Sequence, residues 1–331
     1  MIISLMENIE RRILSLESNP EKFEEIALEI FKYQAYQNPV YKQFLRLIEK
    51  QPEQITRLNE VPFLPIGFFK TQTMKSGIWN PQTYFQSSGT TGSVRSIHHI
   101  KSLEWYHSIC LKIFSNQVGN PNGFRFIGLL PNYLENPHSS LINMVSYLGK
   151  QTGNEVEFCG LQPQRIFKAI EVAGKSEKKV LLFSVTYALL HLAESGGFDF
   201  SDVQIVETGG MKGLRTEMSK LEIIDILRVK LKITNFVSEY GMTEMQSQAY
   251  SRDGLYKPGF SMRVLVRDLD DPMGYSKTSG RGALNLIDLA NWSTCSFLAS
   301  DDLGEVQNDG LFSVSGRAES SDVRGCNLLF S

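Results

Sequence analysis

Apolar residues near the start of the chain recur at the spacing of a helix face. The apolar residues Phe23, Ile26, Ala27, Ile30 and Phe31 recur with the period of a helix, with glutamates between them, as on an amphipathic helix. We therefore predict a helical layer over residues 1–60. The stretch Val61–Lys70 then carries two prolines and three aromatic residues, which predicts an extended, buried connector.

The middle of the chain, residues 61–260, alternates short apolar runs with helical segments. The predicted strands are Ile97–Ile100, Phe124–Leu130, Glu155–Cys159, Val180–Ser184 and Val203–Glu207. The predicted helices are Ser102–Gln117, Ser139–Leu148, Pro163–Ala173, Tyr187–Glu194 and Glu217–Leu231. This alternation predicts a three-layer α/β body with a largely parallel sheet, in which ligands bind at the carboxyl ends of the strands.

The last third of the chain changes to short strands with little helix. We predict strands at Met262–Val266, Ala283–Asp288, Gly304–Val306 and Leu311–Val314. They make residues 261–318 a β-rich lobe, followed by a tail over residues 319–331. The whole chain, residues 1–331, is expected to be one α/β protein.

Composition narrows the class of protein. Of the 331 residues 42% are hydrophobic and 21% are charged, which is enough apolar material for a core. The formal charge is -2, so electrostatics give no reason to expect binding to nucleic acid or to an anionic membrane. Charged residues interrupt the first 14 positions, so we expect neither a signal peptide nor a membrane span, and a cytoplasmic protein. The four cysteines stand singly, which predicts neither structural zinc nor a disulfide framework.

One segment, Phe85–Ser96, carries the first candidate chemistry. Small hydroxyl residues alternate there with two glycines, in the order Ser87, Ser88, Gly89, Thr90, Thr91 and Gly92. Glycines let backbone N–H groups close around an anion and the hydroxyls donate further hydrogen bonds, so the segment is a candidate phosphate cradle. A flexible surface loop is the alternative that the composition alone leaves open.

Further along, two segments fit ATP binding. Tyr240, Thr243 and Glu244 place an aromatic ring, a hydroxyl and a carboxylate within five residues, which suit adenine, a phosphate oxygen and Mg²⁺. The stretch Phe297–Gly304 places two carboxylates before a predicted turn, and Arg317 follows a glycine; a carboxylate with an arginine can hold a ribose diol. Taken singly, each segment also fits a solvated turn. A phosphate-binding loop of the common NTPase type, a dinucleotide fingerprint and a nucleophile elbow are all missing from the sequence.

The order of these motifs resembles the adenylate-forming enzymes, the superfamily of acyl-CoA synthetases, firefly luciferase and nonribosomal adenylation domains. The motifs are Ser87–Gly92, Tyr240–Glu244, Asp301–Gly304 and Gly316-Arg317. Further short segments resemble one branch, the acyl-protein synthetase of the bacterial bioluminescence fatty acid reductase: Phe69-Lys70, Tyr133-Leu134, Ser139–Leu141 and Arg324–Cys326. The resemblance implies the large N-terminal domain of the adenylate-forming fold.

The same resemblance assigns roles to residues. Ser87–Gly92 would wrap the ATP phosphates, Gly209 and Gly210 would line the adenine pocket, and Tyr240 would stack on the base. Thr243 would bind the α-phosphate and Glu244 would bind Mg²⁺, while Asp302 and Arg317 would hold the ribose. His138 would border the acyl pocket, or would be an ordinary hydrogen-bonded loop histidine. His98 and His99 are expected on one strand, one facing in and one facing out.

Three departures from the family pattern stand out. The usual Pro-Lys after the glycine loop is Val94-Arg95 here, and the usual Thr-Gly-Asp is Ser300–Asp302, which leaves Asp301 as a substitute ligand. The sequence ends 14 residues after Arg317, so the small C-terminal domain and its lysine are expected to be missing. We hypothesise that Lys212 replaces that lysine; a surface lysine on a loop is the alternative.

The implied function is a ligase that forms carbon–sulfur bonds. ATP and Mg²⁺ would activate a carboxylic acid, by resemblance a fatty acid, to acyl-AMP, and Cys326, near Arg324, would accept the acyl group for a partner such as an acyl reductase. A cysteine packed in the tail is the alternative for Cys326. The alternative functions are an acid:CoA or acid:carrier-protein ligase and a non-catalytic subunit that binds nucleotide or acyl groups.

Overall fold

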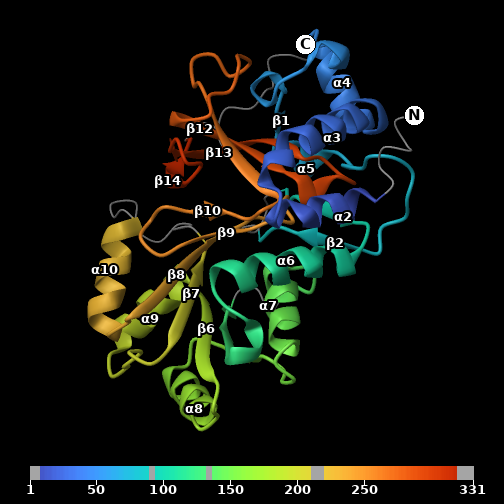
Figure 1. Ribbon diagram of the computed structural model, residues 1–331. Coiled ribbons are helices and arrows are strands. Elements are labelled where there is room, and N and C mark those ends of the chain that lie inside the picture. The colour runs from blue at the N-terminus through green and yellow to red at the C-terminus, as the bar shows by residue number, and fades with distance from the viewer. Residues whose placement is uncertain (1–7, 89–93, 132–135, 210–219, 319–331) are drawn as a thin grey trace. The chain divides into compact units, whose positions relative to one another are not determined.

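The computed structural model describes residues 8–88, 94–131, 136–209 and 220–318. It divides into two compact units (Figure 1). The central unit comprises Phe69–Thr73 and Ile78–Phe260, and the terminal unit comprises Met1–Phe68, Met74–Gly77 and Ser261–Ser331. The terminal unit thus combines the predicted helical layer with the predicted β-rich lobe.

The central unit is built on a mixed sheet whose strands run in the order β10-β9-β8-β7-β6-β4-β5. Strands β5, β4, β6, β7 and β8 are parallel, and β9 and β10 are antiparallel. The strands are β4 (Phe124–Leu129), β5 (Glu157–Cys159), β6 (Lys179–Val185), β7 (Gln204–Thr208), β8 (Asn235–Tyr240), β9 (Ala249–Ser251) and β10 (Lys257–Pro258). The helices are α6 (Leu103–Gln117), α7 (Ser140–Lys150), α8 (Pro163–Gly174), α9 (Thr186–Ser195) and α10 (Lys220–Leu231), with the short η5 (Pro121–Gly123). The predicted α/β body with a largely parallel sheet is confirmed.

Helices cover both faces of this sheet. The α7 helix packs with α6, and α9 packs with α10 (Figure 1). The chain steps from β4 outward to β5 and then back across β4 to β6, so right-handed crossovers put α7 on one face and α8, α9 and α10 on the other. The connections that leave β4 and β6 therefore run in opposite directions along the sheet. Ligands bind at such a point in sheets of this kind.

Local sequence explains where these helices begin. The Ser102 hydroxyl accepts from the Trp105 N–H at 3.1 Å, and the Ser139 hydroxyl accepts from the Ile142 N–H at 3.2 Å; both are N-caps. Before α6, β2 (Thr83–Gln86) and β3 (Ile97–Ile100) form an antiparallel hairpin. The predicted strand at Ile97–Ile100 is confirmed, and its partner β2 was not anticipated.

The terminal unit contains a largely antiparallel sheet with the order β1-β13-β12-β11, and β14 also pairs with β13. Its strands are β1 (Leu64–Pro65), β11 (Met262–Arg267), β12 (Gly280–Asp288), β13 (Phe297–Val306) and β14 (Phe312–Arg317). Its helices are α2 (Ile9–Leu14), α3 (Phe23–Gln37) and α4 (Pro39–Leu47), with the 3₁₀ turns η1 (Ser15–Glu17), η2 (Pro20–Lys22), η3 (Pro52–Gln54), η4 (Leu58–Glu60) and η7 (Leu289–Asn291).

Buried polar side chains join the helices to this sheet. The Gln34 amide of α3 donates to the carbonyls of Asn291 and Trp292 at 3.0 Å and accepts from the Ser296 N–H at 2.9 Å. Asn38 caps α4 and donates to the Thr294 carbonyl at 2.9 Å. Because unpaired buried amides are costly, these bonds specify where the helices dock on the β12–β13 connection.

Two predictions of local structure are wrong. The stretch Phe297–Gly304 does not end in a turn, because β13 continues to Val306 with neighbours on both edges; pairing overrides the turn preference of aspartate and glycine. The connector Val61–Lys70 is extended at Leu64–Pro65, but the chain becomes helical in α5 (Phe68–Thr71), where it passes from the terminal unit to the central unit.

Candidate active site

Ser87 and Ser96 extend the β2–β3 hairpin beyond the ends of its two strands. The Ser87 N–H donates to the Ser96 carbonyl at 3.1 Å, and the Ser96 N–H donates to Ser87 Oγ at 3.0 Å. These bonds extend the strand pairing and close the base of the loop. The Ser87 hydroxyl still carries a proton that it can donate to a phosphate oxygen. Ser88 is half-buried, and Gly89, Thr90, Thr91 and Gly92 lie outside the described residues.

Arg95 stands where the usual lysine of this loop would be. Its guanidinium donates to Gln86 Oε1 at 3.4 Å, across the base of the hairpin, and both Val94 and Arg95 are exposed. The positive charge of Arg95 thus lies beside Gln86 of β2, and its role toward a phosphate remains a prediction.

The second predicted motif lies where β8 ends. Tyr240 is the last residue of β8 and its ring lies 5.8 Å from the ring of Tyr256. Thr243 and Glu244 follow in a turn that is closed by the Met245 N–H donating to the Met242 carbonyl at 3.1 Å. Tyr240, Thr243 and Glu244 are all half-buried, so their side chains retain the partial exposure that a ligand contact requires.

A buried histidine joins this turn to the glycine-loop hairpin. His98 of β3 is completely buried, and its Nδ1 lies 2.8 Å from the Thr243 carbonyl oxygen. His99, its neighbour on the strand, is half-buried, so the predicted alternation is confirmed. Strand β3 and the Thr243 turn, about 145 residues apart in the sequence, are therefore in contact in the central unit.

The burial of His98 makes the stability of the protein depend on pH. Burial lowers the pKa of His98 to about 4, whereas an exposed histidine in the unfolded chain titrates near 6.5. Between these values the unfolded chain binds a proton that the folded chain does not, so acidification from pH 7 to pH 4 is expected to remove up to about 3 kcal/mol of stability through this group. Urea unfolding of the parent and of His98→Leu between pH 7 and pH 4 measures the free energy of unfolding of each. If the two proteins lose stability in parallel as the pH falls, His98 is not the cause.

Further polar side chains gather at the carboxyl ends of the central strands. Thr186, which starts α9 directly after β6, donates its hydroxyl to the Glu207 carboxylate and lies 3.2 Å from the Gly209 carbonyl. The Ser184 hydroxyl lies 3.3 Å from the Leu129 carbonyl of β4. These contacts connect β4, β6 and β7 at the point where the winding direction changes. Gly209 itself is exposed with φ 94°, a conformation that favours glycine.

A second hydroxyl–carboxylate pair lies next to the first. Thr208 of β7 donates its hydroxyl to the Glu239 carboxylate of β8, and the two residues are register partners. A Cβ at Gly241 would lie 2.4 Å from Glu239 Oε1, so the backbone before the Thr243 turn packs directly on this carboxylate. Sequence reasoning gave no role to Thr186, Glu207 or Thr208, because the register that pairs them is a tertiary property.

The predicted ribose pair forms within the terminal unit. Asp302 of β13 and Arg317 of β14 are register partners, and Arg317 Nε donates to Asp302 Oδ1 at 3.0 Å. The Asp302 side chain is 7% exposed and that of Arg317 is 62% exposed. The structure thus brings these two candidates together. The other described candidates, Ser87, Ser88, Gly209, Tyr240, Thr243 and Glu244, belong to the central unit.

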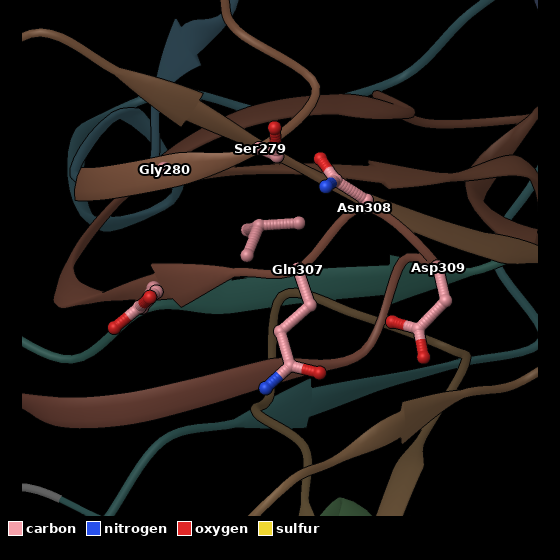
Figure 2. Close-up of a pocket in the computed structure, with 7 residues that line it drawn as sticks. Ser279, Gly280, Gln307, Asn308 and Asp309 are labelled. Atoms are coloured by element: carbon pink, nitrogen blue, oxygen red, sulfur yellow. The ribbon is translucent and has the colours of Figure 1, made fainter.

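The terminal unit also has an open hollow of about 530 Å³. It is lined by Ser279, Gly280 and Glu305–Asp309, with the side chains of Gln307, Asn308 and Asp309 at the turn between β13 and β14 (Figure 2). Asp302 lies four residues back along β13, about 13 Å from this end of the strand. The hollow therefore belongs to the hairpin turn and not to the Asp302–Arg317 pair.

Three candidates lie outside the described residues: Gly210, Lys212 and Cys326. Their assignments remain predictions. His138 is described: its ring stacks on Tyr84 of β2 at 3.9 Å, and its carbonyl accepts from the Gln86 N–H at 2.9 Å. His138 is thereby held beside the β2–β3 hairpin.

Within the ranges 8–88, 94–131, 136–209 and 220–318, no group of three histidine, cysteine, aspartate or glutamate side chains is arranged to hold a metal ion. A Mg²⁺ that is bound with ATP needs only one or two carboxylates, since phosphate oxygens and water supply the other ligands. The half-buried Glu244 fits that requirement. None of the helices in the described part of the chain has the length and apolar character to span a bilayer.

No protein-family model matches this chain, and no curated protein matches it in sequence. Its fold is that of solved adenylate-forming enzymes. A 2-hydroxyisobutyryl-CoA ligase in complex with 2-HIB-AMP and CoA superimposes with a TM-score of 0.64 at 12% identity, over 90% of this chain and 75% of that one. ATP-bound MatB from Rhodopseudomonas palustris superimposes with a TM-score of 0.53 at 16% identity, over 71% of this chain and 47% of that one.

The amide bond synthetase McbA from Marinactinospora thermotolerans gives a TM-score of 0.50 at 19% identity, over 71% of this chain and 48% of that one. This chain spans about half the length of McbA and of MatB. The resemblance to adenylate-forming enzymes is confirmed at the level of the fold, and the acyl-protein synthetase branch remains a prediction.

Proposed function

We propose that this protein is an ATP-dependent ligase that activates a carboxylic acid as acyl-AMP. The observation that carries the proposal is the bond between His98 and Thr243, which joins the strand that leaves the glycine loop to the Thr243–Glu244 turn. The hairpin that carries Ser87 and the turn that carries Thr243 are thus in contact within one unit, and the turn follows the carboxyl end of β8. The fold shared with ATP-bound MatB and with a CoA ligase solved with 2-HIB-AMP supports the same proposal.

In this proposal a carboxylate oxygen of the acid attacks the α-phosphorus of ATP, and the bond to pyrophosphate breaks. Ser87–Gly92 bind the phosphates, Thr243 donates to the α-phosphate and Tyr240 stacks on adenine, with Gly209 and Gly210 beside it. Glu244 would hold Mg²⁺, which neutralises phosphate charge when bound. Such a reaction depends on alignment and charge stabilisation, and Lys212 is the proposed additional cation.

The second step, in the proposal, moves the acyl group to a thiol. The Cys326 thiolate attacks the carbonyl carbon of acyl-AMP, a C–S bond forms, and the C–O bond to AMP breaks. A fatty acid substrate, an acyl-protein product and delivery to a reductase partner complete the proposal. An acid:CoA ligase is the second candidate, favoured by the fold shared with a ligase solved with CoA.

Adenylation is tested by ATP–pyrophosphate exchange with a panel of fatty and aromatic acids. The proposal expects exchange that requires both Mg²⁺ and an acid, with AMP as the nucleotide product. Adding coenzyme A then separates the candidates, because only the CoA ligase gives a free acyl-CoA. If no acid supports exchange and calorimetry detects no binding of ATP, the proposed ligase activity is wrong. The protein would then be a non-catalytic subunit or have another function.

Asp302→Asn is expected to raise the KM for ATP about 10- to 100-fold. The proposed ribose contact is a hydrogen bond to a charged acceptor, for which losses of this size are usual. Asp301→Asn is the matched control, since it neutralises the neighbouring carboxylate on β13. Steady-state exchange kinetics measure the KM for ATP in both variants. A larger increase in Asp301→Asn than in Asp302→Asn would assign the ribose contact to Asp301.

A further inference from the structure

His98 occupies a position that packing alone does not explain. Its imidazole is completely buried in the central unit, edge-on to the Phe69 ring at 5.2 Å. An apolar side chain of similar size would fill this space without the cost of burying a polar ring. The bond from Nδ1 to the Thr243 carbonyl at 2.8 Å is a contact that an apolar residue cannot supply.

The chemistry of this bond defines the state of the ring. A carbonyl oxygen only accepts hydrogen bonds, so Nδ1 must carry the proton and donate it. Because burial lowers the pKa of His98 to about 4, the ring is neutral at physiological pH and Nδ1–H is the tautomer present. The bond is therefore a fixed donor–acceptor contact near neutrality.

The Thr243 turn lies between the paired strands β8 and β9. The bond from the Met245 N–H to the Met242 carbonyl sets the shape of the turn, and the bond from His98 links it to the β2–β3 hairpin. The hairpin is held firmly, because β2 pairs with β3 and the Gln86 N–H also donates to the His138 carbonyl. A contact from β3 transfers that rigidity to the turn.

We propose that His98 is a positioning residue, which holds the Thr243–Glu244 turn against the β2–β3 hairpin that carries Ser87, so that Ser87 and Thr243 bind the same polyphosphate. The inference rests on the proposed function, in which Thr243 binds the α-phosphate of ATP. His98 does not touch ATP in this scheme. It sets the place of the backbone that carries the Thr243 hydroxyl.

The test compares His98→Leu with His98→Asn, two side chains of nearly the same shape. Asparagine can place an amide N–H where Nδ1–H stands, and leucine cannot. We expect His98→Leu to raise the KM for ATP about tenfold in pyrophosphate exchange, the usual effect of one lost hydrogen bond, without changing the KM for the acid. His98→Asn is expected to restore most of the ATP affinity. A loss of folded protein alone would lower the rate and leave both KM values unchanged.

Phe69→Leu is the packing control, because it disturbs the same pocket and leaves the His98 bond in place. It should lower thermal stability without raising the KM for ATP. If it raises that KM as much as His98→Leu does, or if the leucine and asparagine variants behave alike, the positioning role is wrong.

Amide hydrogen exchange provides a readout that needs no activity. In His98→Leu, peptides that cover residues 242–248 are expected to exchange faster, while peptides from β4 stay unchanged; in His98→Asn the protection should return. Unchanged exchange at 242–248 would overturn the inference even if the enzyme is active. Faster exchange in a protein without adenylation activity would keep the anchoring role of His98 and reject the proposed function.

Discussion

Cys326→Ser is expected to abolish the acylated form of the protein while leaving ATP–pyrophosphate exchange intact. After incubation with Mg-ATP and a suitable acid, without coenzyme A, the parent should gain the mass of one acyl group, and neutral hydroxylamine should remove it. A serine hydroxyl ionises far less readily than a thiol, so it cannot replace the thiolate as the nucleophile. Intact-mass spectrometry measures the adduct directly.

The other cysteines make poor acceptors, which sharpens this prediction. Cys110, Cys159 and Cys295 are all buried. Burial raises the pKa of Cys159 to about 11 and that of Cys295 to about 12, so neither forms a useful amount of thiolate near neutrality. A thioester on this chain would accordingly be expected at Cys326, the cysteine outside the described residues.

Cys159→Ala is the matched control and should retain the full adduct. If Cys326→Ser still forms the adduct, the acceptor assignment is wrong. If the parent exchanges pyrophosphate but forms no adduct, the acyl group goes to an external thiol, and the CoA or carrier-protein ligase becomes the better description.

Gly304→Ala is expected to destabilise the terminal unit by about 3 kcal/mol. A Cβ at this position would lie 2.0 Å from the Ser313 carbonyl oxygen of β14 and 3.2 Å from Leu284. The first contact is with backbone, so it can be relieved only if β13 and β14 move apart. Asp302 and Arg317 pair across the same two strands, and their ion pair should weaken as well.

Gly316→Ala provides the comparison on the partner strand. A Cβ there meets nothing within 4 Å, so its free energy of unfolding should change by no more than about 0.5 kcal/mol. Urea unfolding, followed by circular dichroism, measures both variants. Equal stability of the two would show that β13 and β14 can separate at little cost.

Much of the central unit follows from sequence periodicity. Apolar runs such as Val180–Ser184, alternating with amphipathic segments such as Pro163–Ala173, predict buried parallel strands and covering helices, and β6 and α8 appear within a residue or two of those bounds. This works because each element must bury one face or both, whatever its neighbours are. The two hydroxyl-rich and acidic motifs were recognised for a related reason, since small residues with these functional groups suit phosphate and Mg²⁺ by their chemistry alone.

The sequence alone did not predict which distant segments pair with each other; this is seen only in the tertiary structure. The chain order gives no sign that Phe23–Gln37 packs with the β12–β13 connection, because the Gln34 amide finds its partners about 260 residues away. The turn predicted at Asp301–Gly304 became a strand for the same reason: two neighbours supply hydrogen bonds that local preference cannot anticipate.

The sequence by itself determined the α/β class, the order of the motifs and the chemical character of Ser87, Thr243, Glu244, Asp302 and Arg317. Only the tertiary structure decided which of them meet. Asp302 reaches Arg317 through strand register, and Thr243 reaches the glycine-loop hairpin through His98. A side chain's chemistry is local to its residue, but a hydrogen bond across 145 positions depends on how every intervening strand and helix packs.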